Sequence, residues 1–303
     1  MTKPDILLIG SYPDWDMEGL RAGYTLHTEP GPGIRALAMK GHWQMDGAFM
    51  DRLPDLGLIA NFGVGYDAID IAAATERGIK VTNTPDVLTD DVADLAVGML
   101  IAATRHIPQA DAYVRAGRWA ADGDYPLLRK VTGKRAGIFG LGRIGRAIAD
   151  RLAAFHMPIS YYSRAPKETP AGWTHYADPV ALAAEVDYLV VALAGGPETA
   201  GLVSREVIAA LGPKAMLVNI SRGSTVDEGA LLEALESGAL GSAALDVFAS
   251  EPDLDSRFLD LENVLLQPHQ ASATVETRQA MGQLQRDNMA AFFADKPLLT
   301  PVN

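Results

Sequence analysis

Three glycines with a fixed spacing are the first residues of this 303-residue chain whose pattern indicates a chemistry. Gly140, Gly142 and Gly145 form a G-x-G-x-x-G pattern between the apolar run RAGIF and a stretch of helical periodicity. The first glycine permits a tight turn, the second lets the backbone approach a pyrophosphate, and the third permits close packing of helix on strand. The alternative is a glycine-rich turn without a ligand. The strand before and the helix after favour dinucleotide binding, and the chain has no GxxxxGK[ST] motif for an ATP-binding P-loop.

The residues after the next apolar run indicate which dinucleotide is bound. NAD-binding proteins place an Asp or Glu about 20 residues beyond the glycines, on the ribose hydroxyl. The segment ISYYSRAP, residues 159–166, falls there and contains no acid. A carboxylate would repel a 2′-phosphate, whereas Arg164 can pair with it, Ser163 can donate a hydrogen bond and Lys167 adds a positive charge. The sequence predicts NADP(H); a solvated loop arginine is the alternative.

Few residues offer acid–base chemistry of the kind that a dehydrogenase needs. No tyrosine has a lysine four residues later, there is no cysteine for a catalytic zinc, and no HExxH motif occurs, so no metal site is expected. Of the six histidines, only His269 follows a strongly apolar run in the nucleotide-binding half, in NVLLQPHQ. Because ligands bind at the carboxyl ends of parallel strands, His269 is a candidate acid. A histidine at the surface or in packing is the alternative.

The elements that position these residues alternate between apolar, strand-like runs and helical stretches, which is typical of parallel α/β architecture. Strands are expected at 5–10, 34–40, 56–62, 79–85, 135–140, 159–163, 188–194, 215–221, 242–248 and 263–269. A long helix is expected within 89–119, and a last helix over 274–294 that returns to the first unit. The pattern predicts two doubly wound units joined by long helices, with a ligand-binding cleft between them.

Composition limits the classes of protein to be considered. A chain of this length favours two domains. The formal net charge of −12 argues against a nucleic-acid partner, and no apolar run is long enough for a membrane span or a signal peptide. The absence of cysteine excludes disulfides and only weakly favours the cytosol. We therefore expect a cytoplasmic protein without nucleic-acid or membrane partners.

From about residue 56 onward the sequence resembles the D-isomer-specific 2-hydroxyacid dehydrogenases, within them the glyoxylate/hydroxypyruvate and hydroxyphenylpyruvate reductases. The blocks that carry the resemblance are NFGVGYDAIDI, VTNTPDVLTDDVADLAVGML, GIFGLGRIGRAIADRL, LVNISRGSTVDEGALLEAL, AALDVFASEP and PHQASATVETR. The resemblance implies a flavodoxin-like substrate domain, residues 1–97 with about 284–303, and a Rossmann NADP-binding domain, residues 98–283. It also implies a homodimer, with the long helix and the segment around Trp119 at the interface.

The resemblance implies a catalytic set of Arg222, Glu251 and His269. In reduction, protonated His269 would give its proton to the substrate carbonyl oxygen while Glu251 orients the ring and favours its charged form. Arg222 would bind the carboxylate and carbonyl of a 2-oxo acid. The backbone N–H groups of Val64 and Gly65 would bind the same carboxylate, as an anion nest in the first domain.

The resemblance also implies cofactor contacts from Arg143, Ile144, Thr199, Ile220 and Asp246. Two departures from the family pattern are present. LAGGPET, residues 193–199, replaces a Pro-Leu-Thr run before Pro-Glu-Thr, and Gln270 and Ala271 follow the histidine where relatives have a small apolar residue and glycine.

The sequence does not decide which 2-oxo acid is the substrate. Glyoxylate and hydroxypyruvate are the first expectation, and phenylpyruvate or hydroxyphenylpyruvate the alternative. Four side chains are expected near the cleft, as substrate contacts or as packing residues: Tyr12, Trp43, Met45 and Tyr66. A silent NADP-sensing corepressor would not need the catalytic set, and a Rossmann methyltransferase would usually keep an acidic ribose-binding residue.

Overall fold

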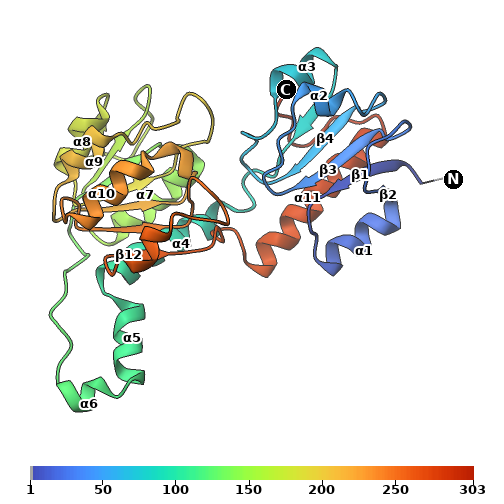
Figure 1. Ribbon diagram of the computed structural model, residues 1–303. Helices are drawn as coiled ribbons and strands as arrows, with labels where there is room; N and C mark the ends of the chain where they lie inside the picture. The colour runs from blue at the N-terminus through green and yellow to red at the C-terminus, as the bar shows by residue number, and fades with distance from the viewer. Residues whose placement is uncertain (1–2) are drawn as a thin grey trace. The chain divides into compact units, whose positions relative to one another are not determined.

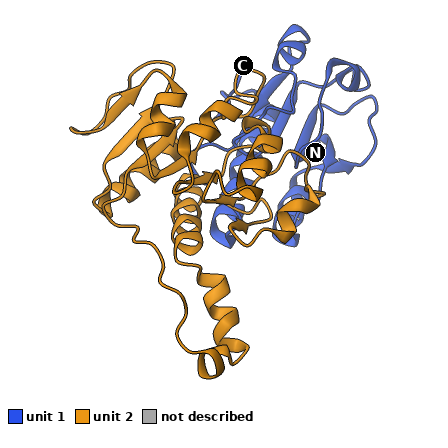
Figure 2. Cartoon of the chain, turned by 60° about the vertical axis from the view of Figure 1, so that its left-hand side comes forward, with its two compact units in different colours: residues 1–88, 272–303 blue, residues 89–271 orange. Residues whose placement is uncertain are grey.

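The computed structural model describes residues 3–303, which divide into two compact units (Figures 1 and 2). Unit 1 runs to Leu88 and resumes with Ser272–Asn303, and unit 2 is Thr89–Ala271. The boundaries expected from the sequence, after residue 97 and near residue 284, fall within α4 (Thr89–Thr104) and α11 (Val275–Phe293). Those boundaries need correction, because each helix belongs as a whole to one unit: α4 to unit 2 and α11 to unit 1.

Unit 1 is a five-stranded parallel sheet in the order β2-β1-β3-β4-β5. Its strands are β1 (Asp5–Ile9), β2 (Thr25–His27), β3 (Ala36–Lys40), β4 (Leu58–Phe62) and β5 (Lys80–Thr82). Its other helices are α1 (Asp14–Gly23), α2 (Gly47–Met50) and α3 (Ile71–Glu76). The helix α11 packs on β4 and α1, so the last helix does return to the first unit (Figure 1). The strand order is flavodoxin-like, as the resemblance implied.

Unit 2 is a seven-stranded parallel sheet in the order β12-β11-β10-β9-β6-β7-β8. Its strands are β6 (Ala136–Phe139), β7 (Ile159–Tyr162), β8 (Thr174–Tyr176), β9 (Tyr188–Val191), β10 (Met216–Asn219), β11 (Ser242–Leu245) and β12 (Val264–Leu266). Its helices include α7 (Arg143–Ala154), α8 (Pro179–Glu185), α9 (Arg205–Leu211) and α10 (Glu228–Glu236). The chain reverses its direction of winding at the β6–β9 neighbours, which is the switch point of a Rossmann sheet.

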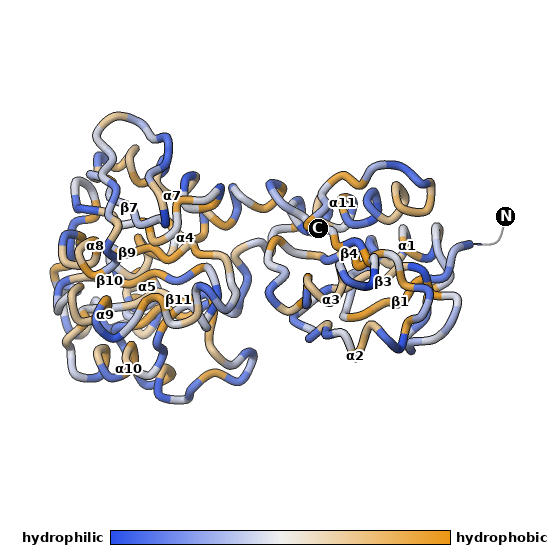
Figure 3. Tube along the Cα trace, turned by 90° about the horizontal axis from the view of Figure 1, so that it is seen from above, coloured by the Kyte–Doolittle hydropathy of each residue, from blue (hydrophilic) through white to orange (hydrophobic). Residues whose placement is uncertain are grey.

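Strand residues supply the two cores, as the hydropathy colouring of Figure 3 shows. All of β4, β6, β9 and β10 is buried, because helices cover both faces of a parallel sheet and leave no solvent-facing side. This explains the continuous apolar runs in the sequence. None of the helices within residues 3–303 is long and apolar enough to cross a membrane.

The long helix expected within residues 89–119 is α4, and two shorter helices occupy the rest of the segment. The segment forms α4, α5 (Ile107–Arg115) and α6 (Arg118–Asp122). Left-handed residues separate them, with φ of 45° at His106 and 71° at Gly117. Pro108 follows the first of these breaks, where it begins a helix but cannot continue one. In Figure 1, α5 and α6 project as an arm from the rest of unit 2.

Candidate active site

A short contact between two candidate catalytic residues joins His269 to Glu251. The His269 Nδ1 lies 2.6 Å from Glu251 Oε2, and the second carboxylate oxygen accepts a 2.9 Å hydrogen bond from the backbone N–H of Phe248. Because a carboxylate only accepts, Nδ1 carries the hydrogen of this bond, and Nε2 is the ring nitrogen for proton exchange with a substrate. The side chains of His269 and Glu251 are 33% and 26% exposed, so both can be reached from solvent.

Arg222 lies in the loop after β10, the sheet neighbour of the strand before Glu251. Its backbone carbonyl accepts hydrogen bonds from Asn219 Nδ2 at 3.0 Å and Thr225 Oγ1 at 2.7 Å. A Cβ on the next residue, Gly223, would overlap the backbone of Phe248. The glycine therefore lets the arginine loop pack directly against the loop that carries Glu251. Three adjacent strand ends, those of β10, β11 and β12, supply Arg222, Glu251 and His269.

Asp246 fixes the backbone beyond His269. It is fully buried after β11, and its two carboxylate oxygens accept from the backbone N–H groups of Gln270 at 2.8 Å and Ala271 at 2.9 Å. Burial raises the pKa of Asp246, although the two backbone hydrogen bonds oppose that rise. His269 itself has a φ of 49°, a left-handed conformation that non-glycine residues seldom adopt. The contact of Asp246 with the nicotinamide stays a prediction; its contacts within the protein give it a positioning role.

The glycine loop has the geometry that its spacing predicts. Gly140 has a φ of 104°, and a Cβ there would lie 2.9 Å from the carbonyl oxygen of Ala192. A Cβ on Gly145 would overlap the carbonyl oxygen of Gly140, so close packing requires a glycine there. At Gly142, which precedes α7, a Cβ would meet no atom within 4 Å. The open side of the turn and the N-terminus of α7, with Arg143 and Ile144, thus fit the pyrophosphate of a dinucleotide.

The loop after β7 presents basic groups where an NAD-binding protein has an acid. Arg164 Nη1 donates to Glu198 Oε2 at 3.1 Å, with both side chains largely exposed. Ser163 Oγ donates to the carbonyl of Ala165 at 2.6 Å. The backbone N–H and C=O of Lys167 both bond to the Tyr161 hydroxyl, which shapes the loop. These residues fit a 2′-phosphate in charge and place, but a cofactor would have to replace Glu198 at the guanidinium.

Thr199 and Ile220, two expected cofactor contacts, lie in the loops after β9 and β10. Thr199 Oγ1 donates to the carbonyl oxygen of Ala194 at 2.6 Å, which closes the loop of residues 193–199 on itself. Ile220 is buried directly after β10. The side chain of Gln270 bonds to that of Gln267. The cofactor contacts of Thr199 and Ile220 stay predictions.

In unit 1 the loop of Val64 and Gly65 follows β4. Asn61 Nδ2 donates to the carbonyls of Gly63 at 3.2 Å and Gly65 at 2.8 Å, and Asn83 Nδ2 donates to that of Val64 at 2.9 Å. Two asparagine side chains thus hold the loop carbonyls, an arrangement that suits a backbone anion nest. Neither asparagine was expected from the sequence, although both stand at strand ends.

The four side chains considered for the substrate pocket divide into two groups. Met45 and Tyr12 are buried, and Met45 belongs to the apolar core of unit 1, which agrees with the packing alternative for Met45. Tyr12 accepts a hydrogen bond from Gln285 within the unit. Trp43 and Tyr66 are exposed.

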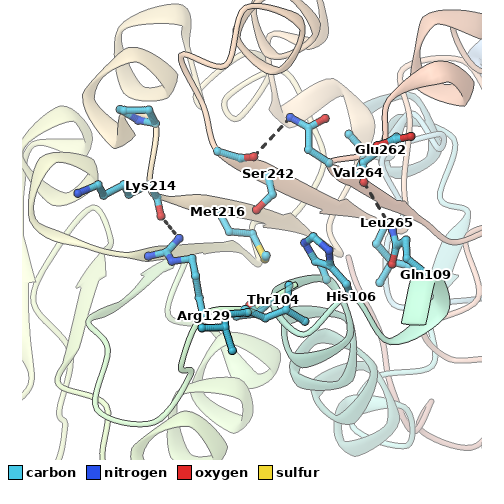
Figure 4. Close-up of a pocket in the computed structure, with 16 residues that line it drawn as sticks. Thr104, His106, Gln109, Arg129, Lys214, Met216, Ser242, Glu262, Val264 and Leu265 are labelled. Carbon is cyan, nitrogen blue, oxygen red and sulfur yellow. Dashed lines mark hydrogen bonds between the residues drawn. The ribbon is translucent and has the colours of Figure 1, made fainter. Parts of the chain in front are cut away.

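A pocket of about 480 Å³ lies elsewhere in unit 2 (Figure 4). Its lining comes from the amino-terminal ends of β10, β11 and β12 and from the base of the arm, including Thr104, His106, Arg129 and Met216. The candidate catalytic residues lie at the opposite, carboxyl ends of these strands. The pocket is therefore separate from the catalytic set.

Comparison with known proteins supplies the family. Residues 97–271 match the family model for the D-isomer specific 2-hydroxyacid dehydrogenase, NAD binding domain. The hydroxyphenylpyruvate reductase of Plectranthus scutellarioides is 49% identical over 288 residues, covering 95% of this chain and 90% of that protein. The 2-ketogluconate reductase of Gluconobacter oxydans (strain 621H) is 44% identical over 310 residues, covering 99% of each.

Solved structures support the same family assignment. The NADPH-dependent glyoxylate/hydroxypyruvate reductase SmGhrB of Sinorhizobium meliloti, in complex with NADP and malonate, is 43% identical and superimposes with a TM-score of 0.94, covering 99% of this chain and 97% of that one. Family model, sequence and fold point to one conclusion. The chain belongs to the D-isomer specific 2-hydroxyacid dehydrogenase family of oxidoreductases, which act on 2-hydroxy and 2-oxo acids.

Proposed function

We propose that this protein is an NADPH-dependent reductase of small 2-oxo acids, foremost glyoxylate and hydroxypyruvate, which it converts to D-2-hydroxy acids. The observation that carries the proposal is the 2.6 Å contact between His269 Nδ1 and Glu251 Oε2. A histidine held in this way has a fixed ring orientation and a carboxylate that stabilises its charged form. Arg222, from the neighbouring strand end, supplies the cation that a 2-oxo acid needs.

Each residue of this set has a separate task in the proposed reaction. Arg222 binds the carboxylate and carbonyl oxygens and polarises the C=O bond. NADPH, when bound, supplies the hydride that the carbonyl carbon accepts. His269 Nε2 gives its proton to the carbonyl oxygen, and Glu251 stabilises the ring while it is charged. In unit 1, the backbone N–H groups of Val64 and Gly65 bind the substrate carboxylate.

The choice of NADPH over NADH rests on Arg164 and Ser163. The loop after β7 holds a guanidinium and a hydroxyl, and residues 159–167 include no Asp or Glu that would repel a 2′-phosphate. The S. meliloti relative, whose name states NADPH dependence and whose structure contains NADP, supports the same choice. Lys167 adds a third positive charge to this loop.

Two other functions compete. The P. scutellarioides relative favours a hydroxyphenylpyruvate reductase, which would use the same catalytic set on an aryl substrate. A silent NADP-sensing corepressor would have no need for the His269–Glu251 pair, and its presence argues against that role. A Rossmann methyltransferase is excluded by membership of the dehydrogenase family.

We also propose a homodimer that forms through the arm of α5 and α6. Apolar side chains are exposed on or beside the arm at Ile107, Val114, Trp119 and Leu127. Such a group of exposed apolar residues is typical of a subunit interface. Sedimentation velocity of the wild type and of Trp119→Ala tests this, with a shift toward monomer expected in the variant.

Initial rates of NADPH and NADH oxidation test the main proposal, measured with glyoxylate, hydroxypyruvate, pyruvate and phenylpyruvate. We expect the highest kcat/KM with NADPH and one of the first two acids. A preference for phenylpyruvate would favour the aryl alternative. An absence of turnover with every acid, together with retained NADPH binding, would support the corepressor.

A further inference from the structure

A lysine ammonium lies beside a pair of aromatic rings at the carboxyl edge of the unit-1 sheet. Lys40 Nζ is 5.1 Å from the ring centroid of Phe62 and 5.6 Å from that of Tyr12. Lys40 ends β3 and Phe62 ends β4, and the two residues are partners in the parallel register. Partners in register project from the same face of a sheet, so the strand pairing itself brings the lysine over the ring.

A second cation lies near the same Phe62 ring as Lys40. Arg278, in the first turn of α11, lies with its guanidinium carbon 5.8 Å from the same Phe62 ring. Among residues 3–303 no carboxylate lies within 4.0 Å of the Lys40 ammonium, and the buried Asp16 forms its ion pair with Arg286 instead. Burial and the charge of Arg278 lower the pKa of Lys40 and outweigh the opposing effect of the Asp16 carboxylate. A partly buried cation in this setting is stabilised by an oxygen ligand.

This cation lies at the same sheet edge as the proposed carboxylate nest. The nest begins directly after Phe62, and Asn61, the residue before that ring, holds its carbonyls. Two groups that can bind an anion therefore lie at neighbouring strand ends: the nest after β4 and the Lys40 ammonium at the end of β3. The nest offers backbone N–H groups to one carboxylate, and Lys40 offers a mobile ammonium to a second group of the same ligand.

We propose that Lys40 is a specificity-determining residue whose ammonium binds an oxygen atom, of a hydroxyl or carboxylate, on the substrate beyond its 2-oxo carbon. This rests on the proposed function, because it places the 2-oxo acid carboxylate in the nest of Val64 and Gly65. Among 2-oxo acids that carry a tail beyond the 2-oxo carbon, the preference is thereby narrowed to those whose tail bears an oxygen; glyoxylate, which has no tail, is unaffected by Lys40. Hydroxypyruvate and 2-ketogluconate belong to this class, whereas pyruvate and phenylpyruvate do not.

The rings of Phe62 and Tyr12 do not shift the preference from oxygen-bearing tails to phenyl tails. The rings of Phe62 and Tyr12 already have the ammonium of Lys40 near them, and Arg278 also lies near Phe62. A phenyl group entering here would displace water from the ammonium and return only a cation–π contact. A hydroxyl or carboxylate would return a charge-assisted hydrogen bond, which is stronger.

The test compares kcat/KM for hydroxypyruvate and 2-ketogluconate with that for pyruvate and phenylpyruvate, each normalised to glyoxylate, which has no tail. In Lys40→Met the preference for oxygen-bearing tails should fall by about 10- to 100-fold, the range of one hydrogen bond to a charged group. The loss should appear mainly in KM, because tail binding is similar in ground and transition states. Lys40→Arg, which keeps the charge, should restore part of the preference. Lys80→Met, at an exposed lysine of β5, is the matched control and should behave as wild type.

An unchanged preference in Lys40→Met would overturn the inference while leaving the proposed function intact. If no 2-oxo acid is reduced, the proposed function fails, and a binding measurement still decides the role of Lys40. The rise in Tm produced by tartronate, a hydroxy diacid, should exceed that produced by D-lactate in the wild type but not in Lys40→Met. Equal rises for the two acids in the wild type would contradict the inference.

Discussion

The guanidinium of Arg164 and the carboxylate of Glu198 form an ion pair, with 3.1 Å between Nη1 and Oε2. Their side chains are 89% and 82% exposed, so water and salt weaken the attraction strongly. A phosphate with up to two negative charges can therefore replace Glu198 at little cost. NADH offers no such group and leaves the ion pair undisturbed.

Arg164→Ala should raise the KM for NADPH by about 10- to 100-fold and leave the KM for NADH nearly unchanged, because only the phosphate loses its charged partner. Steady-state kinetics with both cofactors measure the ratio. Glu198→Gln is the matched variant: it removes the competitor, so the KM for NADPH should fall slightly. Equal effects of Arg164→Ala on the two cofactors would refute the assignment of the 2′-phosphate to this loop.

His269→Ala should lower kcat by about 100- to 10,000-fold, the usual contribution of a positioned acid, while NADPH still binds. Fluorescence titration of the cofactor provides the binding control. Glu251→Gln should also lower kcat, because the ring of His269 loses the carboxylate that holds its orientation. Near-normal turnover in His269→Ala would mean that another group is the acid.

Gly223→Ala should destabilise unit 2 by about 1–3 kcal/mol, because the added methyl overlaps the Phe248 backbone and forces two loops apart. Activity should fall as well, since these loops carry Arg222 and Glu251. Urea denaturation and kcat/KM measure the two effects. Gly229→Ala is the control: a Cβ there meets only the Asp227 carboxylate at 3.6 Å, inside α10, so stability should stay the same or rise.

Asp187, directly before β9, should make stability depend on pH. Burial acts to raise its pKa, but the backbone N–H and guanidinium of Arg135 outweigh burial and lower it below 3.8. A lowered folded-state pKa means that the carboxylate stabilises the fold above pH 3.8 and that this stabilisation fades as pH falls through the lower folded value. Asp187→Asn should cost about 1 kcal/mol at pH 7 and less at pH 3.5 by urea denaturation. Asp124→Asn, at an exposed position of the arm, should show no such pH-dependent loss; a constant loss in Asp187→Asn would contradict the assignment.

The sequence predicted the parts of the molecule that follow from spacing and apolar patterning. The glycine loop, the two parallel sheets and the positions of Arg222, Glu251 and His269 after successive strands all agree with the structure. These features depend on local chemistry: apolar runs make buried strands, and residues at the carboxyl ends of parallel strands meet at one sheet edge.

Features set by tertiary packing were not predictable in this way. The edge strands β2 and β8 have three residues each and no apolar run, so no periodicity reveals them. The helix break at His106 depends on a left-handed residue whose type does not require it. The pairing of Lys40 with Phe62 in register, and that of Arg164 with Glu198, join segments that no local pattern relates.

The hydrogen bonds that hold the loop after His269 also limit the motion of that loop. Both oxygens of Asp246 hold consecutive backbone N–H groups, those of Gln270 and Ala271, while the histidine itself stays in a left-handed conformation. Exchange of these two amide hydrogens with solvent requires Asp246 to release them. Their exchange rates therefore report how often the loop after His269 opens, independently of any bound substrate or cofactor.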